Sequence, residues 1–289
     1  MHTHLTKINF GKILPMKKVV GFVILLFVSA TGFGQYYYND IVSINQSNAN
    51  YKLLKQQNIK TIKGTSFEAD NSPAENFLLE QELDNNKLFT RSNSTDNVVS
   101  VVTSLYENNL LTRTIDTIRG VKTTTEYEYD AAGKIKSITT SSVDPEHNGN
   151  TTEVHAWSYK ANGKPDHMLR IKDRLDTTRV EFIYDEKGNL VEEKWRRKNK
   201  YIDSYYYYYN EKNQLTDIVR LNQKVRKLLP EFIFQYNEQG LVSQMIQVVP
   251  GTGNYLMWKY TYDSRGLKQK EYAYNKRKEL IGRVEYAYQ

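Results

Sequence analysis

Three histidines lie beyond residue 34 and are the first candidates for chemistry: His147, His155 and His167. His147 belongs to the loop 144–150, whose carboxylate and amide oxygens are the ligands that Ca²⁺ prefers. That loop lacks EF-hand spacing, so a solvated hairpin loop explains it better. His155 and His167 flank a predicted turn, but two histidines without a third ligand make a poor zinc site. We therefore expect no metal site and no cofactor.

The sequence names no catalytic residue. Glu192 and Glu193 are adjacent on a predicted strand, so they point to opposite faces and do not form a carboxylate pair. Gly-x-Ser-x-Gly, His-Glu-x-x-His and phosphate-binding glycine-rich patterns do not occur. We predict a protein that is not an enzyme, and an envelope hydrolase with a site assembled from distant residues is the less favoured alternative.

The residues best suited to contact a ligand are aromatic and basic. Tryptophan rings can stack on sugar rings, and a cluster of Lys and Arg attracts anionic glycans or phosphate-bearing polymers. In an antiparallel meander alternate loops lie at the same end, so the loops near residues 199 and 225 should be neighbours and form a basic rim. Charged hairpin tips that discourage edge pairing are the simpler explanation of these charges. The candidate contacts are Trp157, Trp195, Trp258, Arg196, Arg197, Lys198, Lys200, Lys224, Arg226 and Lys227.

A repeated aromatic-x-Tyr motif followed by a turn must position these residues. Residues 182–190, with the sequence Phe-Ile-Tyr-Asp-Glu-Lys-Gly-Asn-Leu, show it in full. The second tyrosines fall at 129, 159, 184, 209, 236 and 262, and the series continues at 274 and 288 in steps of only 12 and 14. The longer steps, of 25 to 30 residues, each hold two strands and two turns of ordinary length. The spacing therefore predicts successive β-hairpins.

The turn of each repeat opens with Asp or Asn in most copies and has Gly or Asn three residues later. An Asp or Asn side chain accepts hydrogen bonds from the next backbone amides, and Gly or Asn adopts the left-handed conformation that ends a bulged type I turn. Alternation places both rings of Tyr-x-Tyr on one face of the sheet, so packing is their simplest role. The predicted turn residues are Asp130, Gly133, Gly163, Asp185, Gly188, Asn210, Asn213, Asn237, Gly240, Asp263 and Gly266.

This pattern resembles the YD repeats of the Rhs family, in which Tyr-Asp-x-x-Gly-x-Leu units build long β-spirals. The resemblance covers about residues 121–289. It implies a surface, shell or carbohydrate-contacting structure. The Gly-Arg pair that often flanks the family's repeats is missing and no C-terminal toxin or self-cleaving segment follows, so a toxin-enclosing shell is not implied.

We predict an all-β fold, an antiparallel meander of about 14–18 strands that curls into a spiral, a barrel-like or a sandwich arrangement. Ser47 could cap a short helix that runs to Gln57, and we expect this helix to cover the N-terminal edge of the sheet. The predicted domains are a polar N-terminal region with that helix and the first hairpins, residues 35–100, and a hairpin-repeat domain, residues 101–289.

Residues 1–34 have the features of an export signal, and the true start could be Met16. Two lysines precede the apolar run 19–30, and small residues at 32 and 34 stand before Gln35. The run is shorter than the roughly 17–25 residues that span a bilayer, and an uncleaved N-terminal anchor is the alternative. We expect a periplasmic, outer-surface or secreted protein.

Composition limits the partners. The chain has no cysteine, which excludes disulfides, thiol chemistry and a lipidated-cysteine anchor. Beyond residue 34 the charge is nearly balanced, with 36 basic and 33 acidic residues, so nucleic acid is not an expected partner. Residues 191–196 carry charge on both faces of a predicted strand, which argues against membrane insertion.

We therefore expect an exported non-enzymatic protein that binds carbohydrate or another surface partner, such as a second envelope protein. A purely structural or protein–protein scaffold is the alternative, and the sequence leaves the oligomeric state open. Which tyrosines stay exposed should separate the two, because a groove lined by exposed rings favours a ligand and buried rings favour a scaffold.

Overall fold

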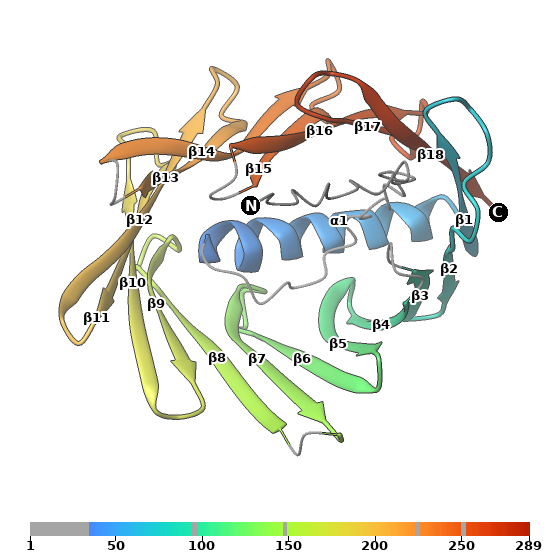
Figure 1. The fold of residues 1–289 in the computed structure, drawn as a ribbon. Helices are drawn as coiled ribbons and strands as arrows, with labels where there is room; N and C mark the ends of the chain where they lie inside the picture. The colour runs from blue at the N-terminus through green and yellow to red at the C-terminus, as the bar shows by residue number, and fades with distance from the viewer. Residues whose placement is uncertain (1–34, 94–97, 147–148, 223–225, 250–252) are drawn as a thin grey trace, which may run out of the picture.

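The computed structural model describes residues 35–93, 98–146, 149–222, 226–249 and 253–289. The predicted export signal lies outside the described residues. Within these ranges, eighteen strands form one antiparallel sheet in which each strand pairs with the next in the chain. The last strand, β18 (Leu280–Tyr288), pairs with the first, β1 (Thr61–Glu68), so the sheet closes into a barrel (Figure 1). The predicted all-β meander is confirmed, and the closed form is the one adopted.

The other strands follow in chain order. The first half holds β2 (Leu79–Asp84), β3 (Lys87–Asn93), β4 (Val99–Glu107), β5 (Leu110–Ile118), β6 (Val121–Tyr129), β7 (Ile135–Asp144), β8 (Gly149–Tyr159) and β9 (Pro165–Lys172). The second half holds β10 (Asp176–Tyr184), β11 (Leu190–Arg197), β12 (Lys200–Tyr209), β13 (Leu215–Asn222), β14 (Lys227–Tyr236), β15 (Val242–Val249), β16 (Asn254–Tyr262) and β17 (Lys268–Tyr274).

The repeat turn between β10 and β11 shows how the motif folds locally. The Asp185 backbone N–H donates to the Asn189 carbonyl at 2.9 Å, and the Gly188 N–H donates back to the Asp185 carbonyl at 3.0 Å. The Asp185 carboxylate also accepts from the Asn189 backbone N–H at 2.7 Å. Gly188 has φ 86°, and the strand register shifts at Tyr184 as a β-bulge requires. Asn213, at the equivalent position of the next repeat, also has a positive φ, of 56°.

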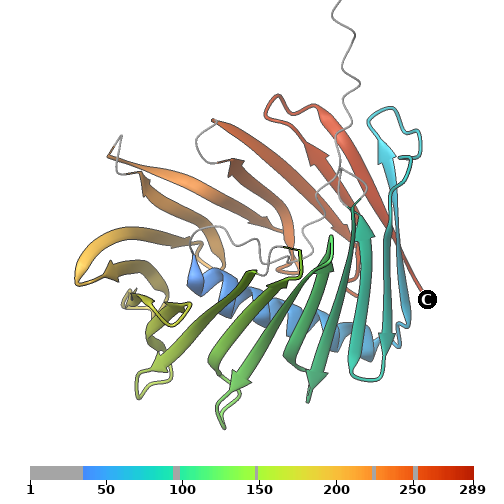
Figure 2. The ribbon, with the colours of Figure 1, turned by 60° about the horizontal axis from the view of Figure 1, so that its bottom comes forward.

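The meander sorts its loops into two sets. The repeat turns, such as 130–134 and 185–189, lie at one end of the barrel, and the return loops that join the other strand pairs lie at the opposite end. In Figure 2 the orange return hairpins β13–β14 and β15–β16 point upward and the green repeat turns point downward.

One helical segment occupies the barrel interior. A π-helical stretch, Tyr37–Val42, continues into α1 (Ser43–Gln56), and both lie inside the ring of strands (Figure 1). The prediction of a short N-terminal helix is confirmed, but its expected position at a sheet edge is wrong. A closed sheet has no free edge, and the interior of a barrel this wide must be filled. Ser47 is likewise not the helix cap: it lies within α1 and its Oγ is 3.0 Å from the Tyr106 hydroxyl.

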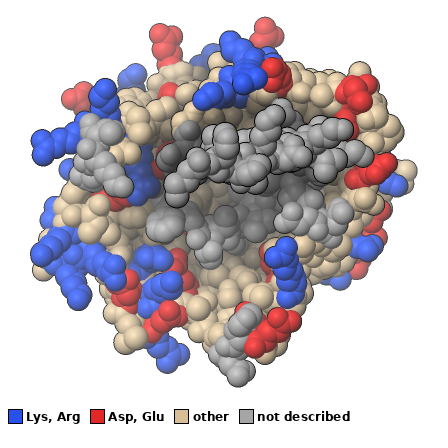
Figure 3. Space-filling view, in the orientation of Figure 1, with Lys and Arg blue, Asp and Glu red and all other residues tan. Residues whose placement is uncertain are grey.

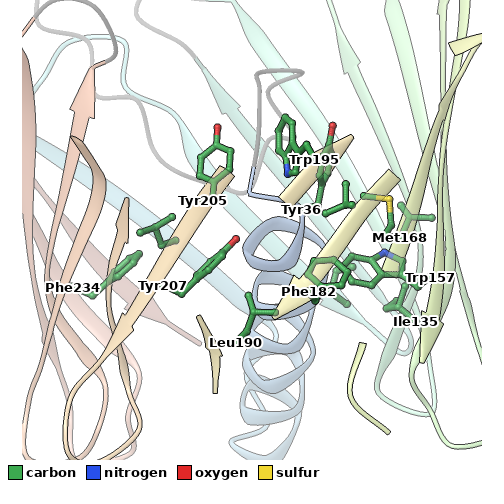
Figure 4. Close-up of a cluster of buried hydrophobic side chains, with 14 of the residues drawn as sticks. Tyr36, Ile135, Trp157, Met168, Phe182, Leu190, Trp195, Tyr205, Tyr207 and Phe234 are labelled. Carbon is green, nitrogen blue, oxygen red and sulfur yellow. The ribbon is translucent and has the colours of Figure 1, made fainter. Parts of the chain in front are cut away.

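Two hydrophobic clusters connect the helical segment to the wall. The first surrounds Tyr36 and receives inward rings from the repeats, including Trp157, Phe182 and Tyr207 (Figure 4). The second surrounds Tyr51 of α1, whose ring stacks on Tyr106 at a centroid distance of 3.7 Å. Within the described residues, no helix combines the length and apolarity needed to cross a membrane.

Candidate ligand-binding surface

The three tryptophans predicted to contact a ligand are all buried. The Trp157 indole N–H donates to Asp40 at 3.1 Å, and the Trp195 indole N–H donates to Glu193 at 2.6 Å. Trp258 lies in the same core cluster. These rings face the interior and hold the N-terminal segment, so a ligand on the outer surface does not reach them.

Glu193 binds the start of the helical segment. Its carboxylate accepts from the backbone N–H groups of Tyr36 and Tyr37, at 3.0 and 3.1 Å, and from the Tyr207 hydroxyl at 2.8 Å. With the Trp195 indole, that makes four donors around one fully buried carboxyl group. A carboxylate is well placed at a helix N-terminus, where backbone N–H groups lack helical partners. Burial raises the pKa of Glu193, and the surrounding donors only partly oppose that shift.

A second polar cluster lies beside it. His155 Nδ1 is 2.7 Å from Asp40 of the helical segment, and its Nε2 is 2.9 Å from Glu153. Arg170 in turn donates to Glu153 at 2.6 Å. Burial opposes the charged imidazole, but Asp40 and Glu153 outweigh it and raise the pKa of His155 to about 9. The cluster is therefore an ion-paired clamp between the wall and the segment.

The other histidines do not join this cluster. His167 lies 2.8 Å from Asp166, its neighbour in sequence, and His147 lies outside the described residues. In the part of the chain that the structure describes, no three His, Cys, Asp or Glu side chains are arranged to hold a metal ion.

The predicted basic residues lie at the return-loop end. Arg196, Arg197, Lys198 and Lys200 at the β11–β12 hairpin and Arg226 and Lys227 at the β13–β14 hairpin are exposed, and Lys224 lies outside the described residues. These two hairpins are brought together through the β12–β13 pairing.

Repeat tyrosines face inward and are engaged by the barrel itself. In six repeats the second tyrosine donates its hydroxyl to a backbone carbonyl that follows the preceding repeat turn, at 2.6–2.8 Å. The pairs are Tyr129 with Leu111, Tyr159 with Ile135, Tyr184 with Pro165, Tyr236 with Leu215, Tyr262 with Val242 and Tyr288 with Lys268. These rings are structural, as the packing interpretation of the sequence expects.

The pair Tyr272-x-Tyr274 departs from this rule. Its neighbour Ala273 is buried in the core and pairs with Trp258, so alternation directs Tyr272 and Tyr274 to the outer face. The step of 12 residues is the cause: it is about half the usual step, so the motif falls one strand further along, on β17. The turn that follows it, 275–279, has the hydrogen bonds of a repeat turn but lies at the return-loop end. The short step is visible in the sequence and is the signal that could have identified this outward pair.

The two outward rings line a shallow groove across β14 to β17. The groove has a volume of about 390 Å³ and both polar and aromatic walls. Tyr272 pairs with Lys259 on the neighbouring strand, and Lys259 pairs with Gln244 on the strand beyond, so the three residues lie in a row. The Lys259 ammonium lies 5.5 Å from the centroid of the Tyr274 ring. The lining residues are Gln235, Ser243, Gln244, Lys259, Tyr260, Thr261, Tyr272 and Tyr274.

Another depression, of about 440 Å³, lies near the repeat turns of β10–β13. Its polar groups are largely paired with each other, as the Asn189 amide is with Asp185 and Asn213, both at 3.2 Å. Tyr208 is its one ring that is exposed by more than a third. The groove of Tyr272 and Tyr274 has two outward rings where this depression has one, and its amide side chains are not paired with each other.

Comparison with known proteins gives structural likenesses alone. No family model matches the chain, and no curated protein matches its sequence. A solved porin-like protein from Bacteroides uniformis is 12% identical, with a TM-score of 0.38 over 80% of this chain and 96% of that one. A porin-like protein from Bacteroides vulgatus is 11% identical, with a TM-score of 0.27 over 80% of this chain and 98% of that one.

The Tc holotoxin pore of Photorhabdus luminescens is also similar, at 11% identity and a TM-score of 0.30. That match covers 80% of this chain but only 17% of the toxin chain. With TM-scores this low, the function has to be argued from the residues.

Proposed function

We propose that the protein is an exported, non-enzymatic polysaccharide-binding protein of the cell envelope or the secreted space. The outward orientation of Tyr272 and Tyr274 is the observation that carries this proposal. Barrel packing uses the inward repeat tyrosines, whereas these two rings face outward, are partly exposed and line a groove.

The groove has the chemistry that an extended sugar chain requires. Rings at i and i+2 on one face of a strand lie roughly 7 Å apart, so each can stack on the C–H face of a different sugar unit. Gln235, Gln244 and Lys259 present amide and ammonium groups that can hydrogen-bond to sugar hydroxyls. A shallow open groove suits a chain that passes over it better than a small molecule that must be enclosed.

Catalysis is not part of the proposal. Glu193, His155 and Asp40 have the residue types of an acid–base site, but their hydrogen bonds go to one another, to other wall residues and to the N-terminal segment. Asp40 and Glu193 are buried, His155 is largely covered, and none of the three lines either of the two depressions described above. Their arrangement supports a structural role.

Binding of the exported protein to a panel of soluble and insoluble envelope polysaccharides tests the function. A ring contact contributes about 0.5–1.5 kcal/mol, so Tyr272→Ala with Tyr274→Ala should weaken binding by about fivefold to 150-fold. The control is Tyr208→Ala, which removes an outward ring from the other depression. Failure of every polysaccharide to bind, or equal binding by the double variant, would overturn the proposal.

A scaffold that contacts other proteins is the second candidate. The inward rings and their hydroxyl bonds favour it, because they show that most of the tyrosine content serves the barrel. In that case the double variant should retain the protein's association with its partner, and no polysaccharide should compete for it.

A further inference from the structure

Exposed hydrophobic side chains gather at the return-loop end of the barrel. In the described part of the chain ten large hydrophobic residues are exposed, and eight of them lie in or beside a return loop. These eight are Val99, Val143, Leu175, Tyr201, Ile202, Leu228, Leu229 and Val249. Scattered exposed hydrophobic residues need no explanation, but a concentration at one end does.

Three neighbouring hairpins carry the most apolar tips. Leu175, at the β9–β10 tip, is 90% exposed. Ile202 follows the β11–β12 tip and is 41% exposed. Leu228 and Leu229 follow the β13–β14 tip and are 45% and 43% exposed. Consecutive strand residues point to opposite faces, so exposure of both leucines means that this hairpin end extends beyond the packed wall.

The same hairpin ends are basic. We name residues 172–176, 196–202 and 226–229 the apolar-basic rim. They include eight Lys or Arg and two Asp, and one of those acids, Asp176, is already paired with Arg197 at 2.6 Å. Figure 3, viewed toward this end, shows Lys and Arg side chains gathered along the left of the rim, where Figure 1 places β9 to β14.

We propose that the apolar-basic rim docks the protein on an anionic lipid bilayer. Basic residues near a membrane surface are attracted to anionic headgroups, and aliphatic side chains gain free energy by entering the boundary between headgroups and acyl chains. Hairpin tips at one end of a barrel can reach a flat surface together. A soluble polyanion would bind the basic side chains but would leave Leu175, Leu228 and Leu229 exposed to water. It would therefore explain the basic residues of the rim and not the aliphatic ones.

This docking is independent of the polysaccharide groove. Tyr272 and Tyr274 face sideways from the outer wall, across β14 to β17, whereas the rim is formed by the ends of β9 to β14. A protein docked through the rim would leave the groove open, and each proposal can fail without the other.

Flotation of the full exported protein with lipid vesicles tests the inference. One vesicle set contains phosphatidylcholine alone and the other contains phosphatidylcholine with phosphatidylglycerol. We expect binding to the anionic set that weakens as salt rises, and little binding to the neutral set. Each basic residue contributes about fivefold to the affinity, so Lys198→Gln with Lys200→Gln should weaken binding about 25-fold.

The apolar half of the rim has its own variant and a matched control. Leu175→Ser, Leu228→Ser and Leu229→Ser together should weaken binding at least tenfold, with thermal unfolding unchanged because all three side chains are exposed. Ile183→Ser with Tyr208→Ser removes hydrophobic groups that are 37% and 46% exposed near the repeat turns, and this control should bind vesicles like the wild type.

Three results would overturn the docking proposal. One is equal vesicle binding by the rim variants and the wild type. Another is equal affinity for neutral and anionic vesicles. The third is binding to heparin, used as a soluble polyanion, with no binding to anionic vesicles, which would assign the basic residues to an anionic polymer instead.

Discussion

Replacing Glu193 by alanine should release the N-terminal segment from the barrel wall. The substitution removes the acceptor of four hydrogen bonds, from the Tyr36 and Tyr37 backbone, the Trp195 indole and the Tyr207 hydroxyl. A buried donor left without a partner costs about 1–3 kcal/mol. The full penalty will not be observed, because the segment can detach and let water reach the donors. We expect the free energy of unfolding to fall by at least about 3 kcal/mol.

Urea unfolding followed by tryptophan fluorescence measures this loss, and Trp195 reports on the segment directly because its ring is 4.7 Å from that of Tyr36. Hydrogen exchange at the Tyr36 and Tyr37 amides should also accelerate. The matched control is Glu192→Ala, one residue away on the outer face, where a partly exposed ion pair with Lys194 and a hydrogen bond from the Ser204 hydroxyl at 3.2 Å together contribute about 1–2 kcal/mol. A loss for Glu193→Ala within error of that for Glu192→Ala would refute the role given to Glu193.

The pH dependence of Glu193→Gln gives an independent check. Because burial raises the folded pKa of Glu193 above its ordinary value of 4.5, the folded state binds this proton more tightly than the unfolded state does. The contribution to stability is therefore complete below pH 4.5 and declines as the pH rises through the folded pKa. The free energy of unfolding of the wild type, relative to that of Glu193→Gln, should therefore fall as the pH rises from 4.5 through the folded pKa. A wild type that gains stability relative to Glu193→Gln as the pH rises would show that the pKa is lowered instead.

Three further predictions concern the barrel. Tyr236→Phe removes a hydroxyl bond of 2.6 Å to a carbonyl and should cost about 1 kcal/mol in urea unfolding, whereas Tyr274→Phe on the outer face should cost almost nothing. Gly188→Ala forces a side chain into φ 86° and should lower stability by about 1–2 kcal/mol, whereas Asn213→Gly, at φ 56° in the equivalent position, should be nearly neutral. The raised pKa of His155, about 9, stabilises the fold fully below pH 6.5 and loses that effect as the pH rises through 9, so wild type and His155→Gln should converge in thermal stability above pH 9.

The hairpins and turns of this fold can be predicted from the sequence because the spacing of nearby residues determines them. A hairpin depends on the residues within one repeat, and the Asp185-to-Gly188 turn forms from contacts four residues apart or closer. Loop sorting follows as well, since a meander must alternate its turns between two ends. The number of strands and the arrangement of basic hairpins at one end therefore need no long-range information.

Closure of the sheet and the place of the helix depend on distant contacts, which spacing does not specify. Glu193 meets Tyr36 across 157 residues of chain, and no short pattern links them. The adjacency of Glu192 and Glu193 shows only that one of them faces inward. Glu193 lies two residues before Trp195 on the same strand, so both side chains face inward. This spacing is the one local sign that the inward acid is buried among aromatic rings.

The outward orientation of Tyr272 and Tyr274 depends both on alternation along their own strand and on packing against distant residues. Inverting their strand would move Tyr272 and Tyr274 inside and Ala273 outside, yet Ala273 sits opposite Trp258 in a core that has no room for two more rings. Packing therefore explains why this pair faces outward, but it does not explain why the two residues are tyrosines. Outward positions of β6 that flank an inward tyrosine, Glu126 and Glu128, are charged and exposed. The barrel does not require aromatic rings at an outward position, and the polysaccharide proposal gives the two beside Lys259 a contact.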